Sequence, residues 1–232
     1  MQGNLCRTVV HEGWGMRRAL MFANGEWREG VAVDRALAEF ADADVIAADG
    51  GVRYALSLDL PVRALIGDLD STPEGIVRRL TAAGTTVVRY GVEKNETDLE
   101  LCLAWATQQG YRHIQILAAF GGRFDQEFSN VMILAAPELK GRKIQMISGN
   151  EVLQVHHPGV IPFAGMQHDR LSLIPLTPEV NGIHTRGLKY PLVDETLFMV
   201  RGRGISNELT GPEAEVRFSS GILCSVQEVR PI

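Results

Sequence analysis

The chain has 232 residues, of which 45% are hydrophobic and 22% charged, and its formal net charge is −5. This length and composition are ordinary for a globular protein with one large domain or two modest ones. The sequence contains no run of basic residues, which argues against nucleic acid as a partner. No apolar run approaches the roughly 18 residues needed to cross a bilayer, which argues against a membrane span.

The N-terminus and the cysteines favour a cytoplasmic protein. Residues 1–16 lack the positive-then-apolar pattern of a secretion signal, and Met16 opens a stretch typical of a natural start. We therefore expect residues 1–16 to be a disordered lead-in. The cysteines Cys6, Cys102 and Cys224 are far apart and form no CxxC pair. This usage argues against a disulfide scaffold or a zinc site and is typical of a reducing compartment.

Between residues 17 and 149 the sequence alternates between short β-rich runs and helical stretches. The β-rich runs are RALMFAN, DVIAAD, ALIGD, TTVVRYG, HIQILAA and KIQMIS. Helices are expected at about 31–42, 52–58, 73–83, 97–109 and 125–136. This alternation predicts an α/β domain with a mainly parallel sheet flanked by helices. Such sheets bind ligands at the carboxyl ends of their strands, so the residues after each strand are the candidate site.

From residue 150 to 232 the sequence changes character. Short β-rich runs are separated by Pro and Gly, and no long helical period appears. The runs are EVLQVHH, RLSLIPL, GIHTRGL, TLFMV, AEVRFSS and GILCSVQEV. This pattern predicts a smaller all-β domain, an antiparallel sandwich or barrel. We therefore expect two domains, 17–149 and 150–232.

The third β-rich run ends in two carboxylates, Asp68 and Asp70, one residue apart. Each alone is a common turn residue. As a pair at a ligand-binding edge they favour a metal site, because neighbouring carboxylates repel and a divalent cation relieves the repulsion. Mg²⁺ takes oxygen ligands and commonly uses one or two carboxylates together with substrate phosphates.

The segment NETDLE, residues 95–100, leads into the fourth predicted helix. Thr97 followed by Glu100 is a capping box, which favours a structural role for Glu100. Asp98 falls at the first helical position, where the helix dipole stabilises its charge, and it also lies within reach of a shared metal. Both roles stay open. Lys94, in the loop before the helix, is either a solvated lysine or a partner for phosphate.

Two other strand ends carry glycines next to charged residues. The second β-rich run ends in Asp49, Gly50 and Gly51, and the fifth is followed by GGRFDQ. Glycines allow close backbone approach. Arg123 can grip a phosphate with its guanidinium fork, and Asp125 is either an N-cap or a ligand-binding residue.

Taken in order, these motifs resemble the thiamine pyrophosphokinase family. The resemblance rests on DGG, GDLDS, EKNETDLE and GGRFDQ in the first domain, and on GLKYPL and GISNEL in the second. It covers about residues 18–230. It implies Mg²⁺-dependent transfer of pyrophosphate from ATP to thiamine, giving thiamine diphosphate and AMP. It also implies a nucleotide-binding α/β domain followed by a thiamine-binding β-sandwich, in a homodimer with the active site at the interface.

The resemblance also implies residue roles, carried over motif by motif. The implied magnesium ligands are Asp68, Asp70 and Asp98, which together with Arg123 form the catalytic set. The implied ATP and phosphate contacts are Asp49, Gly50, Lys94, Thr97, Arg123 and Asp125. The implied thiamine contacts are Ser206 and Asn207. The chain departs from the common bacterial motifs at Asn95 and Gln126, and it lacks a Trp that eukaryotic members carry in the last strand.

Three alternatives remain. DLDST also fits the haloacid dehalogenase phosphatase motif, in which Asp68 would be a covalent nucleophile, although that motif normally ends the first strand of its sheet. The same fold could act as a pyrophosphokinase on another alcohol, such as a pterin carbinol. The chain could also be a non-catalytic homologue that binds nucleotide or thiamine.

Overall fold

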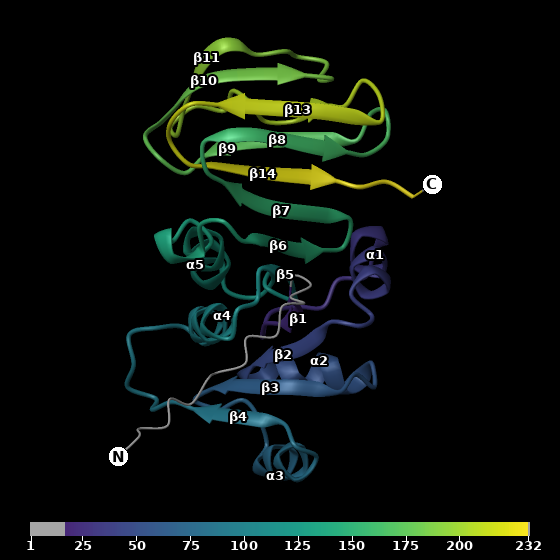
Figure 1. Cartoon of the computed structure of the whole chain (residues 1–232), viewed down its shortest axis with the longest axis vertical. Helices are drawn as coiled ribbons and strands as arrows, with labels where there is room; N and C mark the ends of the chain where they lie inside the picture. Colours follow the sequence, from purple (N-terminus) through teal and green to yellow (C-terminus); the bar gives the residue numbers. More distant parts are fainter. Residues whose placement is uncertain (1–16, 232) are drawn as a thin grey trace, which may run out of the picture.

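The computed structural model describes residues 17–231, and the lead-in expected at 1–16 lies outside them. The first half alternates strands and helices as the sequence predicts (Figure 1). Its strands are β1 (Arg18–Phe22), β2 (Asp44–Ala48), β3 (Val62–Gly67), β4 (Thr86–Arg89), β5 (His113–Leu117) and β6 (Lys143–Ser148). Its helices are α1 (Val31–Glu39), α2 (Val52–Ser57), α3 (Glu74–Ala82), α4 (Asp98–Gln108) and α5 (Phe124–Ile133). Short 3₁₀ turns are η1 (Asp49–Gly51) and η2 (Pro137–Leu139).

These six strands are parallel and lie in the order β6-β5-β1-β2-β3-β4. Alternate strand residues point to opposite sides of the sheet, and apolar residues occupy both sides. Helices therefore pack against both faces. One core packs α4 and α5 against side chains such as Met21, Ile46 and Ile116. The other packs α1, α2 and α3 against Leu20 and Leu65, among others. The predicted α/β architecture is confirmed.

Helix α5 ends earlier than the sequence pattern indicates. It stops at Ile133, and the chain turns through η2 before β6. Ala136 is extended, with φ −60° and ψ 134°, since the residue before a proline avoids the helical region. The extended Ala136 therefore separates the helix from the turn η2, which begins at Pro137.

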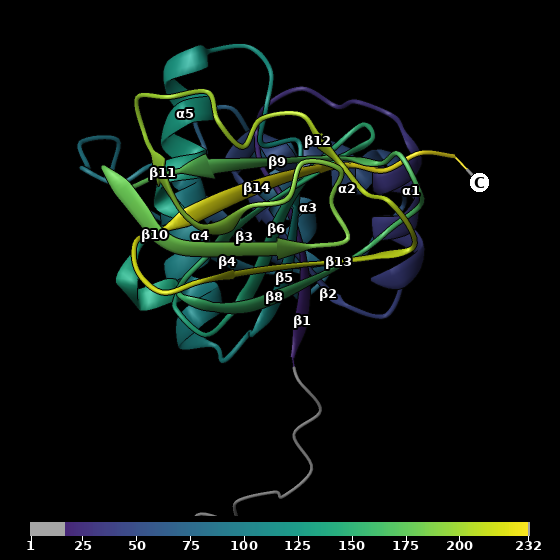
Figure 2. The same cartoon turned by 90° about the horizontal axis from the view of Figure 1, so that it is seen from above.

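The second half is entirely β. Its strands are β7 (Glu151–His156), β8 (Gly159–Ala164), β9 (Arg170–Pro175), β10 (Glu179–Arg186), β11 (Val193–Phe198), β12 (Asn207–Glu208), β13 (Glu213–Phe218) and β14 (Leu223–Glu228). Strands β8, β10, β11 and β13 form a separate four-stranded sheet in the order β11-β10-β13-β8. Its inner face packs on β9 and β14 around a third core that contains Leu173, Val216 and Phe218 (Figure 2). The predicted β-sandwich is confirmed.

One layer of the sandwich is a continuation of the α/β sheet. Strand β7 pairs antiparallel with β6, and β14, β9 and β12 follow, which makes a single sheet of ten strands. The turn between β6 and β7 uses Gly149 with φ 57°, a left-handed conformation that suits glycine. The division at residues 149–150 stays a prediction, because the sheet runs through it without a break.

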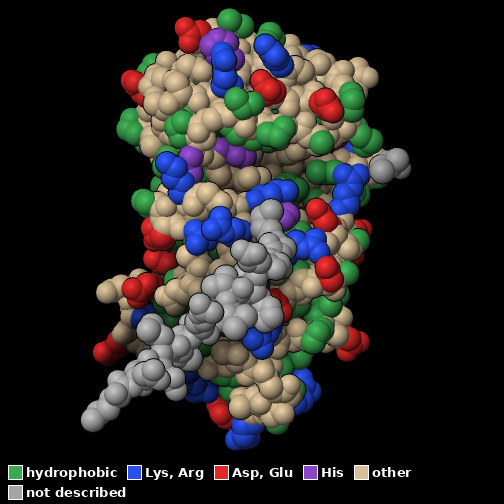
Figure 3. Space-filling view, viewed as in Figure 1, with side chains coloured by type: hydrophobic (Ala, Val, Ile, Leu, Met, Phe, Trp, Pro, Cys, Tyr) green, Lys and Arg blue, Asp and Glu red, His purple; other side chains and the backbone are tan. Residues whose placement is uncertain are grey.

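The ten-stranded sheet follows the long axis of the molecule in Figure 1. On the face seen in Figure 3, a groove lies between the two halves, and histidine and basic side chains gather along it. A cavity lined by Lys143, Gln154 and His156, among others, lies between residues of the two halves. Within residues 17–231, no helix has the length and apolar character that crossing a membrane requires.

Candidate active site

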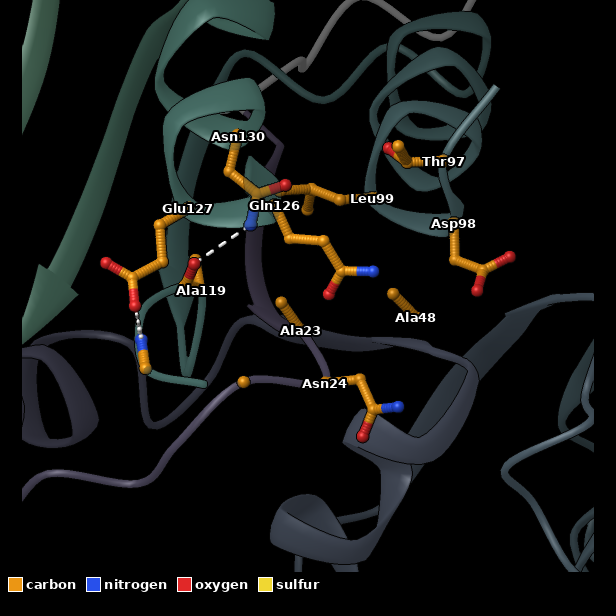
Figure 4. A pocket seen from close by; sticks show the side chains of 12 residues that line it. Ala23, Asn24, Ala48, Thr97, Asp98, Leu99, Ala119, Gln126, Glu127 and Asn130 are labelled. Carbon is orange, nitrogen blue, oxygen red and sulfur yellow. Dashed lines mark hydrogen bonds between the residues drawn. The ribbon is translucent and has the colours of Figure 1, made fainter. Parts of the chain in front are cut away.

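A pocket lies where the carboxyl ends of β1, β2 and β5 meet (Figure 4). The chain winds from β1 outward to β4 and then returns to β5 on the other side of β1. This reversal of strand order is the position at which α/β sheets bind ligands. The pocket has a volume of about 110 Å³ and is lined by Ala23, Asn24, Gly25, Ala48, Thr97, Asp98, Leu99, Ala119, Gly121, Gln126, Glu127 and Asn130. A pocket this small encloses only one part of a nucleotide-sized substrate.

Three carboxylates gather beside this pocket. Asp49, Asp68 and Asp70 each offer an oxygen, and these oxygens all lie within 4.8 Å of one another. Oxygen ligands in a cluster of like charges are the donor set that suits Mg²⁺. Asp49 therefore joins the pair Asp68 and Asp70, although the sequence resemblance implies a nucleotide contact for it and names Asp98 as the third metal ligand.

Local backbone geometry brings these carboxylates together. Leu69 adopts a left-handed conformation, with φ 64°, while its side chain is buried in the core under α1–α3. The buried Leu69 therefore anchors the backbone between Asp68 and Asp70. Asp49, which is 1% exposed, holds the loop by accepting hydrogen bonds from Ser71 N at 3.2 Å and Thr72 Oγ1 at 2.9 Å. The buried Asp49 carboxylate thus fixes the loop as well as completing the cluster.

Lys94 links this cluster to Asp98. Its Nζ donates to Asp68 Oδ2 at 2.8 Å and to Asp98 Oδ1 at 2.6 Å. The side chains of Lys94 and Asp68 are 13% and 12% exposed, so the interaction is shielded from water. Asp98 is 28% exposed and borders the pocket.

The pKa values of these groups shift in different directions. The hydrogen bond from Lys94 lowers the pKa of Asp68. Burial raises the pKa of Asp98, and the interaction with Lys94 only partly opposes it. Burial lowers the pKa of Lys94, but the hydrogen bonds to Asp68 and Asp98 outweigh it, so the pKa rises. Asp98 is therefore the easiest carboxyl of this ion pair to protonate, and Lys94 stays charged.

Thr97 caps helix α4, as the capping box predicts. Its hydroxyl accepts a hydrogen bond from Glu100 N at 3.2 Å, and the helix begins at Asp98. The N-terminus of an α-helix carries a partial positive charge. The end of α4 at the pocket therefore favours anionic groups there.

Arg123 and Asp125 pair with each other in an exposed position. Arg123 Nε donates to Asp125 Oδ1 at 3.1 Å, and the two side chains are 69% and 64% exposed. The alternative role of Asp125 as an N-cap is wrong, since α5 begins at Phe124 and Arg123 occupies the cap position without a side-chain cap bond. Both residues lie at the start of α5, next to the glycines that follow β5.

Several pocket residues are not identified from the sequence as candidates. Glu127 Oε1 accepts from Gly121 N at 2.7 Å, and Asn130 Nδ2 donates to Ala119 O at 2.8 Å, so both hold the glycine loop against α5 (Figure 4). Gln126 and Asn130 are one helical turn apart and line the same pocket. That spacing of polar side chains directly after GGRFD is the signal that could have found them.

Ser206 and Asn207 lie far from the acid cluster within the chain. Asn207 belongs to β12, which is eight strand positions from β3 in the ten-stranded sheet. At about 4.8 Å a strand, this separation is roughly 38 Å along the sheet. Asn207 is 3% exposed and binds the loop at Tyr190, donating to Tyr190 O at 2.7 Å and accepting from Tyr190 N at 3.0 Å. Ser206 is exposed and has φ 56°.

Comparisons with known proteins identify both halves of the chain. A family model described as thiamin pyrophosphokinase, catalytic domain, matches residues 38–146, and one described as thiamin pyrophosphokinase, vitamin B1 binding domain, matches residues 161–223. A thiamine pyrophosphokinase of Bacillus subtilis (strain 168) is 32% identical over 169 residues, which are 72% of this chain and 78% of that protein.

Solved structures agree with these matches. The crystal structure of a thiamine pyrophosphokinase from Bacillus subtilis has a TM-score of 0.81 and 27% identity, covering 93% of this chain and 100% of that one. A thiamin pyrophosphokinase from Geobacillus thermodenitrificans has a TM-score of 0.77 and 29% identity, covering 92% of this chain and 98% of that one. The similarity therefore extends over both halves of the molecule.

Proposed function

Because the chain belongs to the thiamine pyrophosphokinase family, we propose that the carboxyl edge of its α/β sheet transfers pyrophosphate from ATP to the hydroxyl of thiamine. The observation that carries this proposal is the acid cluster Asp49, Asp68 and Asp70, joined to Asp98 through Lys94 beside the pocket. Family membership also removes the phosphatase alternative for Asp68.

We propose Mg²⁺ as the cofactor, held by Asp68 and Asp70 with Asp49 as the third carboxylate. The donor set supports this choice, because three carboxylate oxygens within 4.8 Å of one another offer hard oxygen ligands. An ion held by these three carboxylates would supply positive charge that offsets the negative charge of the phosphates. Asp98 is the less favoured ligand, because it is not among the three carboxylates whose oxygens lie within 4.8 Å of one another.

The remaining residues position charge and a proton. The thiamine oxygen attacks the β-phosphorus, the bond from that phosphorus to the α-phosphate oxygen breaks, and AMP leaves with the electron pair. Lys94, fixed in its charged form, and the exposed Arg123 stabilise negative charge on the phosphates. Asp98, whose raised pKa favours proton uptake, accepts the hydroxyl proton of thiamine.

We also propose that the active site is completed by a second copy of the chain. Ser206 and Asn207 are roughly 38 Å along the sheet from the acids that follow β3. One chain therefore cannot bring its thiamine contacts and its acid cluster to the same small substrate. Two exposed apolar surfaces support a dimer. One is the stripe along α5 formed by Phe124, Phe128 and Met132, and the other is formed by Phe198, Met199, Val200 and Ile205.

Mixing inactive variants tests this arrangement. Asp70→Asn and Ser206→Trp, each inactive alone, should regain activity when they are unfolded and refolded together. Random pairing makes half the dimers hybrid, and each hybrid has one intact site, so we expect about a quarter of wild-type activity. A mixture as inactive as its components, in a protein that sediments as a dimer, would place both residues in the same chain's site.

The reaction itself is tested by incubating the protein with thiamine, ATP and Mg²⁺. We expect AMP and thiamine diphosphate in equal amounts, and no AMP when a pterin carbinol replaces thiamine. Folded protein that forms no AMP would contradict the proposed function. The cytoplasmic location stays a prediction, which the free thiols of the buried Cys102 and Cys224 support.

A further inference from the structure

Arg53 is the centre of a hydrogen-bond network that includes Asn24 and Gly25, two residues that line the pocket. It lies in the first turn of α2, directly after η1. Its Nη1 donates to Asn24 Oδ1 and to Gly50 O, the latter at 3.1 Å. Its Nη2 donates to Gly25 O at 3.0 Å and to the hydroxyl of Tyr54 at 2.8 Å. One side chain thus joins the segment after β1 to the segment after β2.

An aromatic side chain holds the guanidinium in this orientation. Its Cζ lies 4.4 Å from the centroid of the Tyr54 ring, and the Tyr54 hydroxyl donates to Gly25 O at 2.7 Å. Tyr54 in turn packs against Trp27, with ring centroids 5.6 Å apart. Because an aromatic face fixes the plane of a guanidinium, Arg53 presents its donors in one direction.

The segment that Arg53 holds is a wall of the pocket. Asn24, labelled in Figure 4, and Gly25 both line it, and Gly25 N donates to Ala118 O at 2.7 Å on the far side. A Cβ on Gly25 would come within 2.4 Å of Phe120 O. The backbone at Gly25 is therefore held between the loop after β5 on one side and the Arg53 guanidinium on the other.

Arg53 differs from the other basic groups at this edge of the sheet. Lys94 and Arg123 pair with carboxylates, whereas among residues 17–231 the Arg53 guanidinium has no carboxylate within 4.0 Å and binds neutral oxygens only. Four of its five N–H donors are already engaged. The hydrogen bonds of the Arg53 guanidinium therefore fix neighbouring backbone and side-chain groups rather than neutralise a charge.

We infer that Arg53 is a positioning residue for the nucleotide, which sets the wall formed by Asn24 and Gly25 by tying it to Gly50. The inference rests on the proposed function, in which this pocket and the adjoining acids receive ATP. Sequence motifs do not single Arg53 out, because the two partners that line the pocket, Asn24 and Gly25, lie 29 and 28 residues away in the sequence.

Three variants test the inference. Arg53→Ala removes the fork, Arg53→Lys keeps the charge with three donors on a point-like ammonium, and Arg78→Ala, at an exposed position on α3, is the matched control. For Arg53→Ala we expect KM for ATP to rise about tenfold, which equals about 1.4 kcal/mol. We expect kcat and KM for thiamine to stay within about twofold.

Rescue separates positioning from mere stabilisation of the fold. Added guanidinium ion, at concentrations that leave the wild-type and Arg78→Ala proteins unaffected, should lower KM for ATP in Arg53→Ala. Arg53→Lys should fall between the wild type and Arg53→Ala. An unchanged KM for ATP in Arg53→Ala would overturn the inference. It would also be overturned if kcat, the affinities for ATP and thiamine, and Tm all fell together in Arg53→Ala and guanidinium restored none of them.

Titration of Mg²⁺-ATP into each protein keeps this test independent of the reaction. If the wild type binds ATP but forms no AMP when thiamine is also present, the proposed function fails. Tenfold weaker ATP binding by Arg53→Ala would still support the positioning role in that case. Equal ATP affinities in the two proteins would overturn the positioning role even if AMP is formed. A wild-type protein that binds no ATP would overturn both.

Discussion

Two ion-paired groups lie at the carboxyl edge of the sheet, and their surroundings differ sharply. Lys94 is 13% exposed and holds Asp68 and Asp98 at 2.8 and 2.6 Å. Arg123 and Asp125 are 69% and 64% exposed, and within residues 17–231 each forms an ion pair only with the other. Exposed ion pairs contribute little stability, whereas a shielded charge that loses its partner is costly. Lys94 is therefore part of a preorganised frame, and Arg123 is free to exchange Asp125 for a substrate phosphate.

The largest effect is expected at Asp70, the exposed end of the acid cluster. Asp70→Asn keeps the shape of the side chain and removes a metal-binding charge, so turnover should fall about 1,000-fold or more. Tm should not fall, because one of three mutually repelling carboxylates is removed. AMP release and thermal unfolding measure the two outcomes. Asp34→Asn, at an exposed position on α1, is the control. Near-normal turnover in Asp70→Asn would remove Asp70 from the site.

Lys94→Met should lower kcat/KM about 100-fold and also lower Tm. Without the ammonium, the carboxylates of Asp68 and Asp98 face each other in a shielded position. Added Mg²⁺ should recover part of the lost Tm, because a cation then neutralises Asp68. Assays and melting curves with and without Mg²⁺ check both statements, and a Tm equal to that of the wild type would show that the frame does not depend on Lys94.

Arg123→Met is the matched test of the exposed pair. We expect KM for ATP to rise about tenfold through the lost phosphate contact. We expect no change in Tm, since both partners are exposed to water. Steady-state kinetics and melting curves separate the two effects. A fall in Tm as large as that of Lys94→Met would erase the distinction between the two ion pairs.

The smallest effect on turnover is expected at His156, a buried polar group in the other half of the molecule. Burial lowers the pKa of His156 to about 4, and the charge of His157 adds to the shift. The unfolded chain, with a pKa near 6.5, binds more protons below that pH, so stability is complete above pH 6.5 and is lost as pH falls from 6.5 to 4. A shift from 6.5 to about 4 corresponds to a loss of about 3 kcal/mol, at roughly 1.4 kcal/mol per pKa unit.

Chemical denaturation at several pH values between 4 and 7.5 measures this loss. His156→Gln should flatten the dependence over that range, because the titrating group is gone. His156 Nε2 contacts Ser225 Oγ at 2.7 Å, and a glutamine amide can keep a hydrogen bond to that hydroxyl. An unchanged pH profile in the variant would assign the acid sensitivity to another group.

The sequence predicts the positions of the acids well, because each follows a strand of a parallel sheet. Asp68 and Asp70 after β3, and Asp49 after β2, meet since parallel strands end at one edge. The sequence does not show that Asp49 lies with Asp68 and Asp70 in the acid cluster while Asp98 pairs with Lys94. That division depends on the left-handed backbone at Asp49 and Leu69 and on the position of the Lys94 loop.

Other features escape sequence reasoning for identifiable reasons. Strand β8 contains Pro162, which a central strand cannot hold, but β8 pairs only with β13 and is an edge strand. The network around Arg53 and the contacts of Glu127 and Asn130 with the glycine loop join segments that only the folded sheet brings together. Local patterns in the sequence carry no record of such contacts.

The continuous ten-stranded sheet restricts how the molecule can move. Strands β6 and β7 pair in antiparallel register over four residue pairs, from Gln145–Gln154 to Ser148–Glu151, across the point where the α/β pattern ends. A hinge there would have to break this ladder, so the two halves cannot close on a substrate as jaws. Opening and closing would then fall to segments outside the sheet, such as residues 90–97, which carry Lys94 and contain neither helix nor strand.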